Sequence, residues 1–314
     1  MLPLALALAT GACSGPAAPR VTFFHPEWAF TFRYPPRWKA ERARQDGVAY
    51  LFFQSPPTAT SVTGAVGVTV IGQPLGAEQT LDDFAAFYLE GQDVSPRPAE
   101  RPGADRALEA SWADAASRSR LLILEEQGHV FGLHVTGESK RFAELEAEVD
   151  EMLASFALER PALYRPDGDE RFGYALRVPP SWERSRRFTS GDQLFVQYRS
   201  PALSVDPQQQ TVHAALTLSV EPAPGLDAYY EAARLRLGDA QPVISHAEWR
   251  GGYADVMRAE SAMTVSRVRR FYLAGGGRGY SLSCEAREDV QQRVFRWCDL
   301  IASTLVVGAP EGGS

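Results

Sequence analysis

A long internal repeat constrains this 314-residue chain more than any other feature, because a duplicated unit sets the domain organisation before single elements are assigned. Residues 30–38 match residues 174–182, and each stretch is an alternating strand that ends at a Pro-Pro turn. Residues 81–84 match residues 226–229, and each stretch begins a helix with an acidic residue in its first turn. Since the matched segments keep their order, the sequence predicts two copies of one domain.

The last part of each copy predicts a β-hairpin followed by an amphipathic helix. Hairpin strands begin at residues 117–120 and 266–269, and their return strands cover residues 131–135 and 280–284. The apolar positions of the closing helices recur at helical spacing. They are Leu145, Val149, Met152 and Phe156 in the first copy, and Val294, Cys298, Ile301 and Leu305 in the second.

Antiparallel hairpins dominate both copies and no alternating strand–helix–strand pattern occurs, which favours the α+β class. We expect residues 1–19 to be a lipoprotein signal peptide and tether, and residues 20–158 and 171–307 to be the two domains. Residues 159–170 are rich in proline, glycine and charge, so we expect them to form the linker. The Asp-Gly pair at residues 167–168 predicts a turn in that linker.

The two ends of the first copy carry a family resemblance. Residues 34–38 read Tyr-Pro-Pro-Arg-Trp after a strand, and residues 155–156 read Ser-Phe at the end of the last helix. This pattern resembles the PsbP-like family and the related bacterial periplasmic DcrB-type lipoproteins. The second copy departs from it at Val178, Thr304 and Leu305, so its membership rests on the repeat. The resemblance implies two tandem PsbP-like α/β/α sandwich domains, each an antiparallel sheet flanked by helices, with a non-catalytic binding or assembly role.

The N-terminus has the pattern of an export signal. Residues 2–9 are apolar, and Thr10, Gly11 and Ala12 lead directly to Cys13. This resembles a bacterial lipoprotein signal, in which small residues precede the cysteine whose thiol receives the lipid. We therefore expect lipidation at Cys13 and an exported protein that is anchored to a membrane of the cell envelope, on its periplasmic or cell-surface side. The alternative is an ordinary secretory signal with a chance cysteine.

Two cysteines of the second copy predict a disulfide. Cys284 lies on the core face of its strand, and Cys298 lies on the apolar stripe of the last helix. The first copy has Val135 and Val149 at these places, and both pairs are 14 residues apart. A packing contact between two valines in one copy therefore predicts a Cys–Cys contact in the other, and export would favour the bond. The alternative is two buried free thiols that pack as small apolar groups.

The sequence lacks the motifs of common catalytic and metal sites. No His-Glu-x-x-His, Cys-x-x-Cys pair or calcium-loop spacing occurs, and residues 279–283 match Gly-x-Ser-x-Gly only in part, within a predicted strand. His129 and His134 are five residues apart on a strand and so lie on opposite faces. The net charge of −7 gives no electrostatic reason to bind nucleic acid. We predict no catalytic residue, metal site, cofactor or nucleic-acid partner.

Four arginines form the candidate binding surface. Arg118 and Arg120 are two residues apart on a strand and share a face, and Arg267 and Arg269 repeat this spacing in the second copy. Such a pair suits a carboxylate or a lipid headgroup. The alternative is that these arginines only decorate the solvent-exposed ends of strands.

The signal at Cys13, the duplicated domain and the missing catalytic motifs together predict a function. They favour an exported, lipid-anchored adaptor that binds another envelope protein and has no catalytic activity. The alternative is a periplasmic carrier of a small apolar or lipid ligand, suggested by the aromatic clusters at residues 23–24 and 51–53. Packing within the core also explains these aromatic residues.

Overall fold

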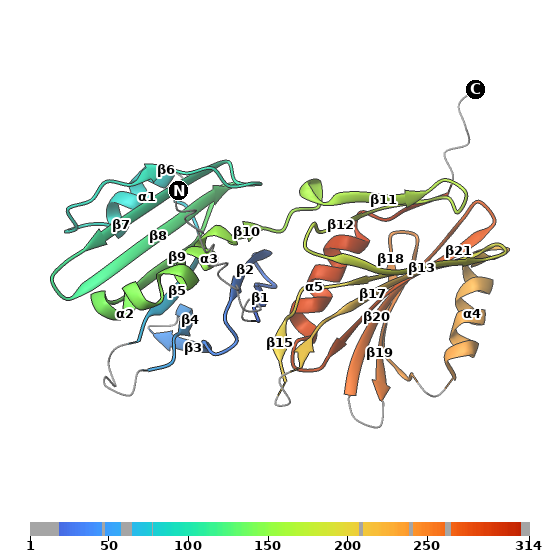
Figure 1. The fold of residues 1–314 in the computed structure, drawn as a ribbon. Coiled ribbons are helices and arrows are strands. Elements are labelled where there is room, and N and C mark those ends of the chain that lie inside the picture. Colours follow the sequence, from blue (N-terminus) through green and yellow to red (C-terminus); the bar gives the residue numbers. More distant parts are fainter. Residues whose placement is uncertain are drawn as a thin grey trace, which may run out of the picture.

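The computed structural model describes residues 19–45, 48–57, 65–76, 78–206, 210–238, 241–260 and 265–308. Two halves lie side by side in Figure 1, each built on a seven-stranded sheet and a separate three-stranded sheet. We refer to the chain before residue 159 as the first domain and to the chain from residue 165 as the second. The expected signal and the lipidation site Cys13 lie outside the described residues.

The first domain contains strands β1 to β10 and helices α1 to α3. Its strands are β1 (Val21–Phe24), β2 (Phe30–Tyr34), β3 (Lys39–Gln45), β4 (Val48–Gln54), β5 (Gly67–Pro74), β6 (Arg97–Pro98), β7 (Arg106–Ala113), β8 (Ser117–Glu126), β9 (His129–Glu138) and β10 (Ala157–Leu158). Its helices are α1 (Leu81–Tyr88), α2 (Ser139–Glu144) and α3 (Glu146–Ala154). The large sheet has the order β3-β4-β5-β9-β8-β7-β6, and the small sheet has the order β1-β2-β10.

The second domain follows a short 3₁₀ helix, Pro161–Leu163. Its strands are β11 (Arg165–Asp169), β12 (Tyr174–Val178), β13 (Glu183–Ser190), β14 (Gln193–Arg199), β15 (Ser204–Val205), β16 (Thr211–Val212), β17 (Ala215–Pro222), β18 (Val243–Trp249), β19 (Gly252–Glu260), β20 (Val265–Gly275), β21 (Arg278–Arg287) and β22 (Val306–Val307). Its helices are α4 (Leu226–Leu237) and α5 (Gln291–Ala302). The large sheet has the order β13-β14-β17-β21-β20-β19-β18, the small sheet has the order β11-β12-β22, and β15 pairs with β16.

The two domains repeat the same topology, as the sequence predicts. Corresponding strands occupy corresponding places in both large sheets, and every strand pair among the described residues is antiparallel. A detail of the small sheets is also duplicated. The backbone N–H of Arg33 donates to the hydroxyl of Ser155 at 2.8 Å, and the backbone N–H of Arg177 donates to the hydroxyl of Thr304 at 2.8 Å. Each hydroxyl ties the strand to the end of the closing helix.

The segment after residue 164 differs from the expected linker. Residues 165–169 form β11, in which Asp167 lies opposite Leu176 and Gly168 opposite Ala175 of β12. The predicted Asp-Gly turn is therefore wrong. Asp167 accepts a hydrogen bond from the hydroxyl of Tyr198, so its carboxylate belongs to the second domain. Strand β11 has the place in the second small sheet that β1 has in the first.

Helices cover the faces of the large sheets only in part, so the fold is broadly α+β with sheets as its main component. Helix α1 begins at a capping box, in which Thr80 and Asp83 satisfy each other's backbone N–H groups. It packs Leu81 and Phe84 against β7 and β8. The opposite face of that sheet buries Phe142 of α2 beside the apolar residues of α3. Helices α4 and α5 take the corresponding places in the second domain.

The predicted disulfide is present in the structure. Cys284 of β21 and Cys298 of α5 are bonded, their Cα atoms lie 6.3 Å apart, and both residues are fully buried. Val135 and Val149 are fully buried at the corresponding places of the first domain. The two copies therefore hold the closing helix against the same strand by different means.

Replacing Cys284 and Cys298 together with valine should lower the free energy of unfolding, because the unfolded chain regains the freedom of a loop of about 15 residues. The expected loss is roughly 3 kcal/mol. Urea unfolding of the wild type and of the C284V/C298V variant, followed by circular dichroism, measures it. Reduced wild-type protein is the control, and a variant as stable as the oxidised wild type would contradict the prediction.

Candidate functional site

The small sheet of the first domain lies on the side of that domain that faces the second domain (Figure 1). Because neighbouring residues of a strand point to opposite faces, β1 serves two cores at once. Phe23 is buried with Phe30 and Phe32 in the core of the first domain. Phe24 and Ala29 belong instead to the buried cluster of the second domain. The two domains therefore share part of their apolar core.

Aromatic rings carry this contact. The ring of Phe24 stacks on Trp297 of α5, with centroids 5.0 Å apart and planes within 4°. Within the second domain, Trp182 packs edge to face on Trp297 at 5.3 Å and so supports the ring that Phe24 meets. The backbone N–H of Thr22 donates to the carbonyl of Ala202 at 2.6 Å, which adds a hydrogen bond between the domains. A stacked aromatic pair is worth about 1 kcal/mol beyond its buried area, so the Phe24–Trp297 pair adds to the free energy that holds the domains together.

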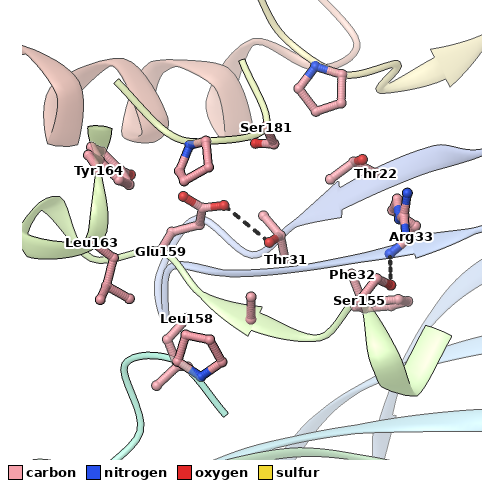
Figure 2. Close-up of a pocket in the computed structure, with 14 residues that line it drawn as sticks. Thr22, Thr31, Phe32, Arg33, Ser155, Leu158, Glu159, Leu163, Tyr164 and Ser181 are labelled. Carbon is pink, nitrogen blue, oxygen red and sulfur yellow. Dashed lines mark hydrogen bonds between the residues drawn. The ribbon is translucent and has the colours of Figure 1, made fainter. Parts of the chain in front are cut away.

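A cleft of 580 Å³ opens beside this contact (Figure 2). Both domains supply its walls. The lining residues are Thr22, Thr31, Phe32, Arg33, Pro102, Ser155, Ala157, Leu158, Glu159, Leu163, Tyr164, Pro180, Ser181 and Pro201. A junction between domains, a mostly apolar lining and a few polar groups are the usual properties of a ligand site, and the volume falls in the range of such sites.

Glu159 is the polar centre of the cleft. Figure 2 shows its carboxylate between Thr31 and Tyr164. The side chain is buried, and its two oxygens accept hydrogen bonds from the Thr31 hydroxyl at 3.1 Å and from the indole N–H of Trp297 at 3.3 Å. Its backbone N–H donates to the carbonyl of Ala29 at 2.7 Å, which fixes its position next to β10. Burial is the main cause that raises the pKa of the Glu159 carboxyl group above its ordinary value.

The two arginines near Glu159 lie closest to other carboxylates, and the charge of Arg160 only partly opposes the effect of burial on the pKa of Glu159. The guanidinium group of Arg160 binds the carboxylate of Glu126 and the carbonyl of Ala29. Arg33, the other charged residue of the lining, has its Nε 3.9 Å from Glu151. Within the part of the chain that the structure describes, the carboxylate of Glu159 has no ion pair. The cleft therefore has one buried acidic group whose hydrogen bonds come from neutral donors.

The four predicted surface arginines bind carboxylates of their own chain. Three of these pairs join the sheet to its closing helix, and Arg267 binds Glu288 just before α5. The pairs are Arg118–Glu146 at 3.2 Å, Arg120–Asp150, Arg267–Glu288 at 2.9 Å and Arg269–Asp299 at 2.9 Å. The structure does not bring the two predicted pairs together in the cleft. Binding of an external anion by these arginines stays a prediction.

A second polar cluster lies beneath α4. Asp255 is fully buried, and its carboxylate meets Nδ1 of His246 at 2.6 Å and the hydroxyl of Tyr230 at 3.2 Å. Arg234 lies 3.9 Å from the same carboxylate. Burial is the main cause that raises the pKa of Tyr230 to about 12. These contacts join α4 to β18 and β19 and balance the buried charge inside the cluster.

The described residues contain neither a candidate metal site nor a helix that could span a membrane. Groups of three or more histidine, cysteine, aspartate or glutamate side chains with metal-binding geometry do not occur among them. His129 is exposed, whereas His134 stacks on Trp112 and shares a hydrogen bond with the hydroxyl of Tyr88 at 3.1 Å. No helix in the described part of the chain is long and apolar enough to cross a membrane.

Comparison with known proteins returns structural neighbours only, since the sequence matches no known family profile and no curated protein. The cyanobacterial PsbP protein of Synechocystis sp. PCC 6803 shares 12% identity over 48% of this chain and 98% of its own, with a TM-score of 0.35. LpqN of Mycobacterium tuberculosis, described as involved in cell envelope biogenesis, shares 16% over 46% of this chain and 89% of its own, with a TM-score of 0.30. The immunity protein TplEi of Pseudomonas aeruginosa shares 9% over 93% of this chain and 98% of its own, with a TM-score of 0.23.

The matches to PsbP and LpqN each cover about half of this chain. Their identities are 16% or lower and their TM-scores are below 0.5, so no conclusion about function follows from them.

The sequence did not reveal the cleft or its acidic residue. Glu159 stands at the start of the expected linker, where a charged residue is ordinary. One signal was available, because Gly308 of the second copy holds the position that corresponds to Glu159 of the first. Both residues donate a backbone hydrogen bond to the turn before the second strand of their small sheet, to Ala29 and to Gly173. The carboxylate of Glu159, at a position where the second copy has glycine, therefore distinguishes the end of the first copy from the end of the second.

Truncating the shared ring tests the docking of the domains. The F24A variant should lose about 3 kcal/mol of unfolding free energy, because it leaves a cavity against Trp297 in the core of the second domain. F188A is the matched control, since Phe188 of the edge strand β13 is 59% exposed and stacks on Phe195 of the same domain. We expect its effect to be about 1 kcal/mol or less. Chemical unfolding of both variants measures the difference, and equal losses would contradict a shared core.

The raised pKa of Glu159 predicts a pH dependence of stability. Between the ordinary glutamate pKa of 4.5 and the higher pKa of the folded protein, the folded state holds a proton that the unfolded chain has released. The contribution of Glu159 to the free energy of unfolding of the wild type therefore falls as the pH rises through that window. The E159Q variant lacks the effect, so the free energy of unfolding of the variant minus that of the wild type should increase with pH. Urea unfolding from pH 4 upward tests this, and a constant difference would refute it.

Proposed function

We propose that the protein is an exported, non-catalytic binding protein of the bacterial cell envelope that carries a small apolar or amphipathic ligand in the cleft between its domains. The observation that carries the proposal is the 580 Å³ cleft, which has an apolar lining and one buried acidic group at a fixed domain junction. The sequence left two functions open, an adaptor and a carrier. The cleft supports the carrier, because a small ligand needs such a cavity.

The location in the envelope rests on two features of the chain. The residues before Cys13 have the pattern of a lipoprotein signal, and we propose that a lipid on Cys13 holds the protein at a membrane. The disulfide between Cys284 and Cys298 fits an oxidising compartment. A tether of a few residues would then keep the cleft within reach of the membrane surface.

An adaptor for another envelope protein is the second candidate, and strand β13 favours it. This strand lies at the edge of its large sheet, and its eight residues are all exposed. Phe188 adds an exposed aromatic ring to it. Extended segments of partner proteins pair with such edges. The charged side chains of β13 oppose non-specific pairing of this edge with the edges of other chains. The same charges are therefore also compatible with a protein that has no partner at this edge.

Native mass spectrometry of protein extracted from its own envelope separates the two functions. A persistent extra mass of a few hundred daltons beyond the anchor would support the carrier. A stoichiometric protein companion without a small ligand would support the adaptor instead.

Filling the cleft should abolish uptake of a neutral apolar dye, N-phenyl-1-naphthylamine, whose fluorescence rises in apolar surroundings. The S181W variant places a large ring at the cleft wall, on a residue that is exposed and so tolerates substitution. The S190W variant places the same ring on β13, outside the cleft, and should bind the dye as the wild type does. Equal dye binding by both variants would exclude the cleft as the site.

A further inference from the structure

The acidic group of the cleft lacks a counter-ion among the described residues. An ionised carboxylate away from water is costly unless a cation compensates it. Thr31 and Trp297 donate hydrogen bonds to the two oxygens of Glu159, but both donors are neutral. The adjacent Arg160 is held by Glu126. The protein therefore satisfies the hydrogen bonding of this carboxylate. Its charge is met only by the field of Arg160, which acts against the larger effect of burial, and no ion pair joins the two among the described residues.

The surroundings of Glu159 are apolar on both sides of the cleft. The first domain contributes Pro102 and Leu158, and the second contributes Pro180 and Pro201. Leu163 of the 3₁₀ helix is 41% exposed and lies beside Glu159 in Figure 2. A molecule that enters the cleft meets apolar surface and, at one place, a buried acidic group.

Arg33 does not supply the missing charge. Figure 2 shows it near Phe32 and Ser155, on the other side of Thr31 from Glu159. Its guanidinium group is about half exposed and lies 3.9 Å from the carboxylate of Glu151. Glu151 of α3 also binds Arg20 at 2.5 Å, so the positive charge at that end belongs to a cluster of two arginines around one carboxylate, away from Glu159.

We propose that the ligand of this cleft is an amphipathic amine, whose ammonium group binds the carboxylate of Glu159 and whose apolar part packs against Leu158, Leu163 and the prolines of the two walls. This inference rests on the proposed carrier function. An ammonium ion supplies the charge that the site lacks, and a charge-assisted hydrogen bond is about twice as strong as a neutral one. An alcohol of the same length gains only a neutral hydrogen bond. A fatty acid brings a second negative charge to a buried carboxylate and is disfavoured.

Displacement of N-phenyl-1-naphthylamine from the full-length protein tests the selectivity. The probes are octylamine, 1-octanol and octanoate at pH 7.5, all below their aggregation concentrations. We expect octylamine to bind about tenfold or more tighter than octanol, and octanoate to bind weakest. Equal binding of the amine and the alcohol would overturn the inference and leave the carrier function standing. If no probe displaces the dye and S181W binds the dye as the wild type does, both proposals fail.

The E159Q variant removes the charge while keeping the shape of the side chain. It should bind octylamine only as well as it binds octanol, and its affinity for octanol should stay that of the wild type. E144Q is the matched control, because Glu144 is exposed on α2 and outside the cleft, and it should keep the preference for the amine. An E159Q variant that retains the full preference would refute the role of this residue.

A pH series on the wild type gives a second test that does not depend on how the variant folds. Octylamine keeps its charge between pH 5 and 8, whereas Glu159 takes up a proton as the pH falls. Tyr164 faces Glu159, and burial raises its pKa, so it stays neutral in this range. Arg160 and Arg33 stay charged throughout. The affinity for octylamine should therefore fall toward acid pH while that for octanol stays constant, and parallel pH profiles would overturn the inference.

Discussion

The stacking of Phe24 on Trp297 is the contact on which the arrangement of this molecule depends. A single short strand supplies Phe23 to one core and Phe24 to the other, because side chains alternate across a strand. This shared ring, together with Ala29 and the hydrogen bond from Thr22 to Ala202, sets how the two domains face each other. The cleft depends on this docking, since its walls come from both domains.

Much of the fold could be predicted because the information is local and occurs twice. The acidic first turns of α1 and α4 and the valine pair that mirrors Cys284 and Cys298 needed no knowledge of distant contacts. Strand β11 could not be found in this way. Its sequence Arg-Pro-Asp-Gly-Asp carries turn-forming residues, and the strand forms because β12 offers it a complete set of partners. Tertiary context here overrides local preference.

The candidate site was hidden for a related reason. Glu159 is buried by Trp297, which stands 138 residues later in the chain, so no window of sequence around residue 159 predicts its surroundings. The burial of Phe24 is similar, because residues 23–24 look like any apolar strand until the second domain covers one of the two rings. The arginines at residues 118–120 were visible as a pattern, and their acidic partners on α3 lie about 30 residues away.

The burial of Phe24 and Ala29 of the first domain in the core of the second has a consequence for the history of the chain. Two copies joined by a simple tether can separate again, because each carries a complete interior. Here a split of the gene at the junction would leave the second copy with a hole beside Trp297 and the first with an exposed phenylalanine. The fusion has thus become difficult to reverse, and any later change in one copy is selected in the presence of the other.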